Sequence, residues 1–133
     1  MSDLRNTILS SDDVPEETVT IPEWGNVTVV IKGMTGESRA HMMSRSVDPE
    51  TGEMSFEALY PEVLIATLMD PETGEPIFGP ADRAAINTKS GGVLERIARE
   101  GMRLSGLTKD EQVQLGKDSS EASDGSTSDS PST

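Results

Sequence analysis

Residues 17–32 read ETVTIPEWGNVTVVIK, and this stretch decides the expected fold. β-Branched side chains dominate residues 18–22 and 27–31, as is typical of strands. Residues 23–26 (EWGN) lie between the two runs, and Gly and Asn readily adopt the positive φ that a tight turn requires. The stretch therefore predicts a β-hairpin. Because an isolated hairpin is marginally stable in water, we expect it to pack on the rest of the chain.

Residues 56–68 carry the strongest helical pattern. Apolar side chains recur there at spacings of three and four, which predicts an amphipathic helix: Phe56, Leu59, Tyr60, Val63, Leu64 and Leu68. Pro61 interrupts this pattern. Two alternatives are open. Either the helix starts near Glu57 with Pro61 in its first turn, or the helix kinks at the proline.

Capping residues and apolar spacing predict further helices on both sides of this one. On the N-terminal side, Ser2 and Asp3 cap a short helix with Leu4, Ile8 and Leu9, and Thr35 caps residues 36–46 with Ala40 and Met43 on one face. On the C-terminal side, the predicted helices cover residues 80–88 after Gly79, residues 91–105 after Ser90 and ending before Gly106, and a last short segment from Thr108 to about Leu115.

These elements together predict an α+β fold, an N-terminal β-hairpin packed on a small helical bundle. We expect one small domain over residues 1–117. Residues 118–133 (DSSEASDGSTSDSPST) hold four acidic residues and no Leu, Ile, Val, Phe or Met. Such a segment cannot bury enough apolar surface to offset the entropy of ordering, so we predict a disordered, acidic, Ser-rich tail.

The charge of the chain restricts its partners. Eleven basic and 24 acidic residues give a formal charge of −13. Such a chain repels nucleic acid and anionic membranes, and it suits basic or amphipathic proteins. Cysteine is absent, and no apolar run approaches the roughly 20 residues of a membrane-spanning helix.

The hexapeptide DPETGE occurs twice, at residues 48–53 and 70–75. Asp at the first position, Pro at the second and Gly at the fifth predict a type I turn that closes on a residue with positive φ. A calcium loop is the alternative, because carboxylates gather here. The alternating ligands of an EF-hand are missing, however, and Pro lies inside the repeat, so we favour the turn.

The sequence offers no grouping typical of an active site or of a metal or cofactor site. His41 is the single histidine and no cysteine accompanies it, so a metal site would depend on carboxylates. A serine hydrolase needs a placed base, and no nucleophile-elbow pattern is present. Gly91-Gly92 lacks the full glycine and lysine pattern of a phosphate-binding loop. We therefore predict a protein that is not an enzyme and that uses no cofactor.

Methionine is more frequent than the aromatic residues, with seven Met against one Trp, one Tyr and two Phe. Met side chains adapt to irregular partners, although filling the core is the commoner role of any given Met. We predict that an apolar contact region for a protein partner lies at or beside five residues, for which a place in the core is the alternative: Leu64, Leu68, Met69, Ile97 and Met102.

Several short stretches, taken in order, resemble tail assembly chaperones of phages with long non-contractile tails. The resemblance spans roughly residues 3–115. It is carried by residues 19–25 (VTIPEWG), 27–31, 33–39 (GMTGESR), 70–74 (DPETG), 76–78, 89–90 and 104–108 (LSGLT).

The resemblance implies that the chain binds the tape-measure protein during assembly of the tail tube, in the host cytoplasm, and that it is absent from the finished virion. It also implies a longer partner made by a −1 ribosomal frameshift near the end of this shorter product. Leu115-Gly116-Lys117 permits codons that contain the slippery heptamer G-GGA-AAG. The alternatives are a head–tail or minor tail virion protein and an acidic DNA mimic.

Overall fold

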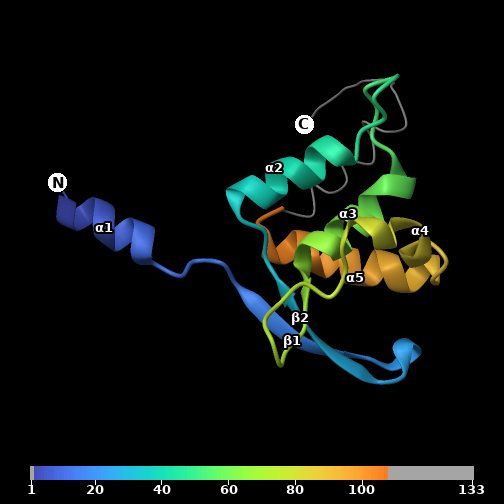
Figure 1. Ribbon diagram of the computed structural model, residues 1–133, viewed down its shortest axis with the longest axis horizontal. Helices are drawn as coiled ribbons and strands as arrows, with labels where there is room; N and C mark the ends of the chain where they lie inside the picture. The colour runs from blue at the N-terminus through green and yellow to red at the C-terminus, as the bar shows by residue number, and fades with distance from the viewer. Residues whose placement is uncertain (1, 108–133) are drawn as a thin grey trace, which may run out of the picture.

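The computed structural model describes residues 2–107 (Figure 1). It confirms the predicted α+β class, because an antiparallel sheet of order β1-β2-β3 packs with helices. The predicted helix from Thr108 to Leu115, the domain limit at residue 117 and the tail lie outside the described residues. In chain order the elements are α1 (Ser2–Ser10), β1 (Glu16–Ile21), the 3₁₀ turn η1 (Pro22–Trp24), β2 (Val27–Lys32), α2 (Gly36–Arg45), α3 (Phe56–Thr67), β3 (Leu68–Met69), the 3₁₀ turn η2 (Pro80–Asp82), α4 (Arg83–Ile86) and α5 (Gly91–Leu104).

The predicted hairpin is confirmed. Strands β1 and β2 pair from Glu16 opposite Lys32 to Ile21 opposite Val27. At its tip, η1 is followed by Gly25 and Asn26, whose φ values are 81° and 59°. These left-handed conformations turn the chain into β2, as the glycine and asparagine predict.

A third strand was not predicted. Leu68 and Met69 form β3 and pair with Ile31 and Val30 of β2. The helix predicted to reach Leu68 therefore ends at Thr67. Leu68 matches the helical spacing, but its backbone is extended, with φ −87° and ψ 123°. An apolar residue that faces the core fits a helix and a strand equally well, so the apolar pattern could not distinguish the two conformations.

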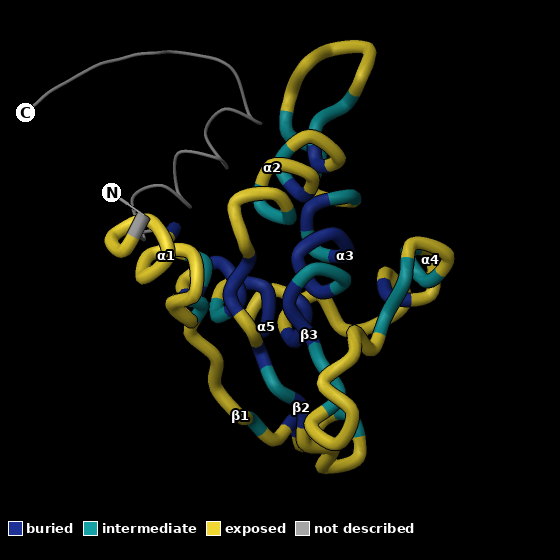
Figure 2. Tube along the Cα trace, turned by 60° about the vertical axis from the view of Figure 1, so that its left-hand side comes forward, coloured by how far each residue is buried: buried dark blue, intermediate teal, exposed yellow. Residues whose placement is uncertain are grey.

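Helix α3 lies at the centre of the core, between α2 and α5 (Figure 2). It is buried on most of its sides and is not the simple amphipathic helix expected from its spacing. The helix starts at Phe56, near Glu57 as the first alternative has it, but Pro61 lies beyond the first turn, so that alternative places the proline wrongly. The buried α3 residues are Leu59, Pro61, Glu62, Val63, Leu64 and Thr67.

Helix α5 is the amphipathic one. Its predicted start is confirmed, because the Ser90 hydroxyl caps the helix by accepting a hydrogen bond from Val93 N–H. Its predicted end is confirmed too, since Gly106 takes a φ of 87°. Arginines occupy its exposed side, whereas its buried side holds Val93, Leu94, Ile97, Ala98, Gly101, Met102 and Leu104.

One serine joins the end of α5 to the start of α2. The Ser105 hydroxyl accepts a hydrogen bond from Met34 N–H at 2.9 Å and donates one to the Gly101 carbonyl at 2.6 Å. A Cβ atom on Gly33 would lie 2.4 Å from the Leu104 carbonyl oxygen. The close approach therefore requires glycine at residue 33.

Two helix predictions need correction. Thr35 caps α2 as expected, but Ala40 is exposed, and the buried residues are Met42 and Ser46. Ser46 tolerates burial because its hydroxyl donates to the Met42 carbonyl, so the buried face contains a polar residue that an apolar pattern passes over.

The second correction concerns residues 80–88. The segment begins at Pro80 as predicted, but it is the turn η2 followed by the single-turn helix α4, which ends at Ile86. The Thr88 hydroxyl bonds to the Ala85 carbonyl at 2.6 Å, and this local hydrogen bond competes with continuation of the helix.

The predicted N-terminal helix is present as α1, with Ser2 and Asp3 inside the helix instead of before it, and it stands apart from the other elements, joined to β1 by an extended stretch (Figure 1). All its residues from Asp3 to Ser10 are exposed. Pro15 marks the point where the chain joins the sheet, since its carbonyl accepts a hydrogen bond from Gly33 N–H at 2.8 Å.

Candidate protein-binding surface

Four of the five residues predicted at or beside a contact region lie in the core. Leu64 and Leu68 have no exposed surface, and Ile97 and Met102 are 3% and 6% exposed. They come from α3, β3 and α5 and belong to one core cluster, in which α3 packs against α5. Because these four side chains are buried, a partner could contact them only after these elements move apart.

Met69 is the member of the five that reaches the surface. It is half-buried and lies opposite Val30 on one side and Pro76 on the other. Val30 is also opposite Thr18, so one row of side chains crosses the sheet. Ile31 and Leu68, the neighbouring pair, are buried on the inner face. Because side chains alternate along a strand, the Val30–Met69 row lies on the outer face.

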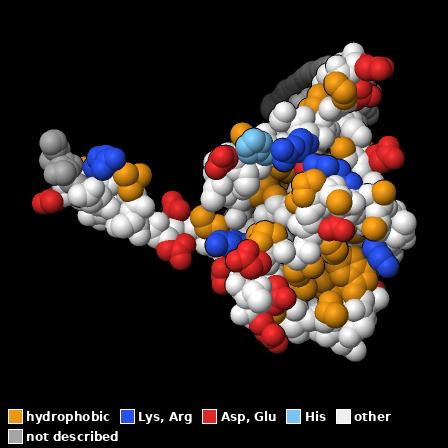
Figure 3. Space-filling view, viewed as in Figure 1, with side chains coloured by type: hydrophobic (Ala, Val, Ile, Leu, Met, Phe, Trp, Pro, Cys, Tyr) orange, Lys and Arg blue, Asp and Glu red, His pale blue; other side chains and the backbone are white. Residues whose placement is uncertain are grey.

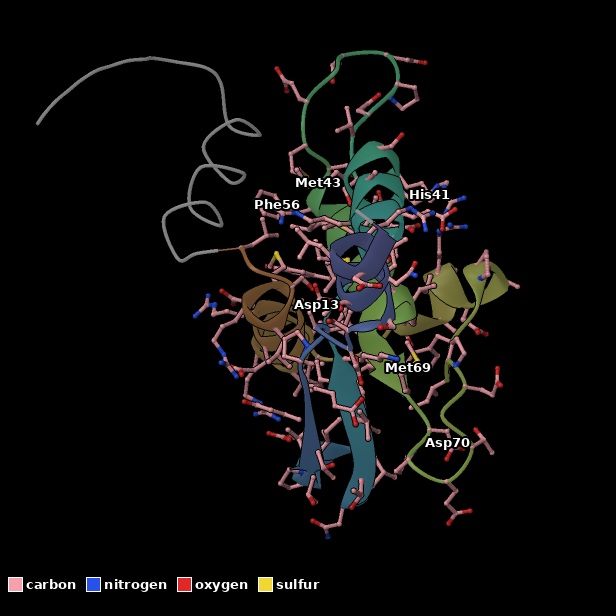
Figure 4. All side chains as sticks on the ribbon, turned by 90° about the vertical axis from the view of Figure 1, so that its left-hand side faces the viewer. Asp13, His41, Met43, Phe56, Met69 and Asp70 are labelled. Atoms are coloured by element: carbon pink, nitrogen blue, oxygen red, sulfur yellow. The ribbon has the colours of Figure 1, made fainter. Side chains whose placement is uncertain are left out.

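The other methionines of the described range fill the core or pack against it, which is the commoner role. Met34, Met42 and Met102 are buried, whereas Met43 and Met54 are partly buried against the core. Val30 and Met69 are not part of this cluster. Figure 4 shows Met69 just before the turn that carries Asp70.

A groove of about 330 Å³ separates α2 from α3. Its floor holds Glu62, whose carboxylate is 4% exposed and accepts a hydrogen bond from Arg83 Nε. This ion pair offsets the cost of a buried charge. The groove thus presents both apolar and charged groups, and its walls include Ser38, His41 and Arg45 from α2 and Ile65 and Ala66 from α3.

The acidic repeats form matching turns at opposite ends of α3. In each turn the Asp carboxylate accepts a hydrogen bond at 2.8 Å, from Glu50 N–H to Asp48 and from Glu72 N–H to Asp70. Gly52 and Gly74 both have a φ of 75°. A turn that closes on a glycine of positive φ is therefore confirmed, and in each turn the glycine N–H donates to the carbonyl of the Asp four residues earlier. In Figure 3 acidic side chains lie at both ends of the body, with basic and apolar groups between them.

Arginines of α5 neutralise carboxylates of the hairpin. Arg96 donates two hydrogen bonds to Glu23, at 2.9 and 2.7 Å, and Arg103 donates to Glu17 at 2.7 Å. The hydrogen bonds from Arg96, together with a backbone hydrogen bond, lower the pKa of Glu23 from 4.5 to about 2. Within residues 2–107 the excess negative charge consequently resides on the two DPETGE turns and on the linker after α1.

The single histidine does not belong to a metal-binding group in the described range. His41 is largely exposed, and its Nε2 lies 4.0 Å from Glu37 Oε2. Within residues 2–107 no cluster of three or more His, Cys, Asp or Glu side chains could hold a metal ion. None of the helices in this range is long and apolar enough to cross a membrane.

Comparison with protein families decides the identity. Residues 3–122 match the family described as phage tail assembly chaperone. The chain belongs to this family. The family and the fold point to a non-enzymatic role for the chaperone. No match is found among curated proteins.

A solved structure supports the fold of the chaperone. The structure of bacteriophage HK97 tail assembly chaperone aligns with a TM-score of 0.53 and 20% sequence identity, covering 78% of this chain and 95% of that chain. At this identity the likeness concerns the fold alone. It agrees with the expectation drawn from the short motifs of the hairpin and the turns.

The sequence did not indicate three parts of the chaperone's surface. The outer-face row depends on β3, the groove depends on how α2 packs on α3, and the Glu62–Arg83 pair joins residues that are 21 positions apart. Apolar spacing could not show the first, because β3 has only two residues. The sequence signal for this ion pair was Glu62, an acidic residue within the apolar pattern of residues 56–68.

Proposed function

We propose that this chaperone binds the tape-measure protein and keeps it soluble while the tail tube is assembled. The observation that carries the proposal is the family match over residues 3–122. A long helical client with exposed apolar stripes aggregates unless another protein covers them. A small acidic protein with apolar surface features is suited to that task.

The chaperone presents two candidate contact surfaces on its body. The outer-face row of Val30 and Met69 offers apolar area on a sheet, and the groove between α2 and α3 offers apolar and charged groups together. Of the five residues predicted at or beside the contact, Met69 has exposed surface, and we propose it as the one that touches a client directly. For the other four, the prediction becomes that they lie beneath the contact region and not in it.

A longer partner, made by a −1 frameshift, forms the second part of the proposal. A slip at Leu115-Gly116-Lys117 would leave residues 1–117 common to both products and would exchange only the following segment. Expression of the gene with its downstream region, followed by mass spectrometry, tests this. A junction peptide that departs from this sequence after Lys117 is expected. A single 133-residue product would contradict the frameshifted pair.

The site of action distinguishes the proposal from a virion protein. We propose that the chaperone acts in the host cytoplasm, that the tail tube protein displaces it from the client, and that it is absent from mature particles. Mass spectrometry of purified virions should not find it. Its recovery at a fixed ratio to tail proteins would favour a head–tail or minor tail component instead.

The DNA-mimic alternative requires one continuous acidic face. The two acidic turns lie at opposite ends of α3, and α5 arginines neutralise Glu17 and Glu23 of the hairpin. This arrangement supports a protein client over mimicry of DNA.

Co-purification tests the binding directly. When a C-terminally tagged chaperone is co-expressed with the cognate tape-measure protein, the client should be captured with it. Capture of the tail tube protein alone, without the tape-measure protein, would contradict the proposal.

A further inference from the structure

Helix α1 presents large apolar side chains to solvent. Leu4, Ile8 and Leu9 are 68%, 61% and 66% exposed, although each is a large aliphatic group. Spacings of four and five place them on one half of the helix, and we call these three residues the α1 stripe. The helix projects from the body, and neither Figure 1 nor Figure 3 shows another element covering it.

The opposite half of α1 needs no partner. The Thr7 hydroxyl donates to the Asp3 carbonyl at 2.8 Å, and the Ser10 hydroxyl donates to the Asn6 carbonyl at 2.8 Å. Helical geometry places Arg5 on the same half as the stripe, between Ile8 and Leu9, and its guanidinium donates a hydrogen bond to Asn6 Oδ1 at 3.3 Å. These polar side chains form hydrogen bonds within the helix, and the stripe is the part that lacks a partner among the described residues.

The length of α1 makes a partner necessary for stability. The helix has nine residues, and isolated helices shorter than about 12–15 residues are marginal in water. Burial of an aliphatic side chain contributes roughly 1.5–3 kcal/mol, so docking of the stripe would stabilise the helix. We infer that α1 is a docking arm that becomes fully ordered on its partner.

Charge indicates what the partner is. Asp12, Asp13 and Glu16 follow the arm, and none of them forms an ion pair with a residue in the described range. The whole chain carries −13, so a second copy would bring carboxylates against carboxylates. The partner that complements the arm is a helix whose apolar stripe is bordered by Lys and Arg.

We propose that the α1 stripe grips such a basic amphipathic helix of the client. The assignment rests on the proposed function, because it places that helix in the tape-measure protein. To the proposed function it adds that helix α1 of the chaperone makes the contact and that the client segment is basic and amphipathic. The arm would act in addition to the body surfaces around Met69 and the α2–α3 groove.

The test compares capture of the co-expressed tape-measure protein by three C-terminally tagged chaperones. They are the wild type, a stripe variant (Leu4→Gln, Ile8→Gln, Leu9→Gln) and a control on the polar half (Asn6→Gln, Thr7→Gln, Ser10→Gln). Glutamine retains good helix propensity, so the stripe variant removes apolar surface without breaking the helix. The melting temperature of the body should be the same in all three.

We expect the stripe variant to capture at least tenfold less client than the wild type, and the control to capture a similar amount to the wild type. Equal capture by the stripe variant would overturn the arm proposal while the proposed function stands. If even the wild type captures no client, the proposed function fails and the arm proposal fails with it.

Two further measurements identify the partner. Replacing Asp12 and Asp13 by Asn and Glu16 by Gln should weaken capture and flatten its dependence on salt. Unchanged salt dependence would contradict a basic client segment.

Light scattering on the chaperone alone is the second measurement. If the stripe variant loses self-association but keeps full client capture, the arm joins copies of the chaperone and the proposal is wrong.

Discussion

The side-chain amide of Asn87 donates a hydrogen bond to the backbone carbonyl oxygen of Glu57 at 2.8 Å. This carbonyl would accept from residue 61 in an unbroken helix, but residue 61 is proline and has no N–H. Asn87 thus replaces the hydrogen bond that Pro61 removes. It also connects the segment after α4 to the start of α3.

We predict that Asn87→Ala lowers the free energy of unfolding by about 1 kcal/mol, since it leaves the Glu57 carbonyl without this donor. In a Pro61→Ala background the alanine N–H can take over, so the same substitution should cost clearly less. Urea unfolding of the four proteins in this double-mutant cycle measures the difference. An equal cost in both backgrounds would show that the two residues are independent.

Gly101 is the residue that allows α5 to cross α3 closely. A Cβ atom there would lie 2.9 Å from Thr67 Oγ1 and 3.1 Å from Val63 Cγ1. Gly101→Ala should therefore destabilise the fold by about 1–3 kcal/mol, despite the better helix propensity of alanine. Gly92→Ala is the matched control in the same helix, because its Cβ meets only Ser90 Oγ at 3.8 Å. Thermal unfolding that ranks the two variants in the opposite order would refute this account of the crossing.

The Glu23–Arg96 pair should make stability depend on pH. The pKa of Glu23 is about 2 in the folded protein, below its usual 4.5, because the Arg96 side chain donates hydrogen bonds to the carboxylate. A depressed pKa in the folded state stabilises the protein fully above pH 4.5, and this contribution is lost as the pH falls toward 2. The difference in unfolding free energy between the wild type and Glu23→Gln should shrink over that window.

Urea titrations at pH 6, 4 and 3 in low salt measure this difference. Glu50→Gln is the control for the change in net charge, since Glu50 forms no ion pair with any residue in the described part of the chain. High salt should reduce the effect, because both partners of the pair are half-exposed. A difference that stays constant with pH would contradict the role assigned to the pair.

The C-terminal segment should contribute little to stability. Residues 118–133 hold no Leu, Ile, Val, Phe or Met, so a chain that ends at Lys117 should melt within a degree or two of the full chain. Differential scanning calorimetry checks this expectation. A loss of several degrees would mean that the segment packs on the domain.

The sequence predicted the elements that local chemistry determines. The hairpin, the Thr35 and Ser90 caps, both DPETGE turns and the glycine after α5 all follow from side chains next to one another in the chain. Each of these features depends on a few neighbouring residues, and the structure confirms each of them.

The parts that the sequence did not predict depend on contacts between distant residues. The two-residue strand β3 exists because β2 is there to pair with it, and Leu68 fits both a helix and a strand. Burial of Glu62 depends on Arg83, and burial of Ser46 depends on the Met42 carbonyl. The exposure of the α1 stripe likewise depends on tertiary structure. The spacing of its apolar residues predicts the helix, but it does not predict that no other described element packs on it.

The solubility of the tape-measure protein is the measurement that bears on the proposed chaperone function. The cognate tape-measure protein is expressed alone and together with this chaperone, and its soluble fraction is measured after centrifugation. We predict that most of the protein sediments when it is expressed alone and that it remains soluble, in complex with the chaperone, when the two are expressed together. An equal soluble fraction with and without the chaperone would contradict the proposed function.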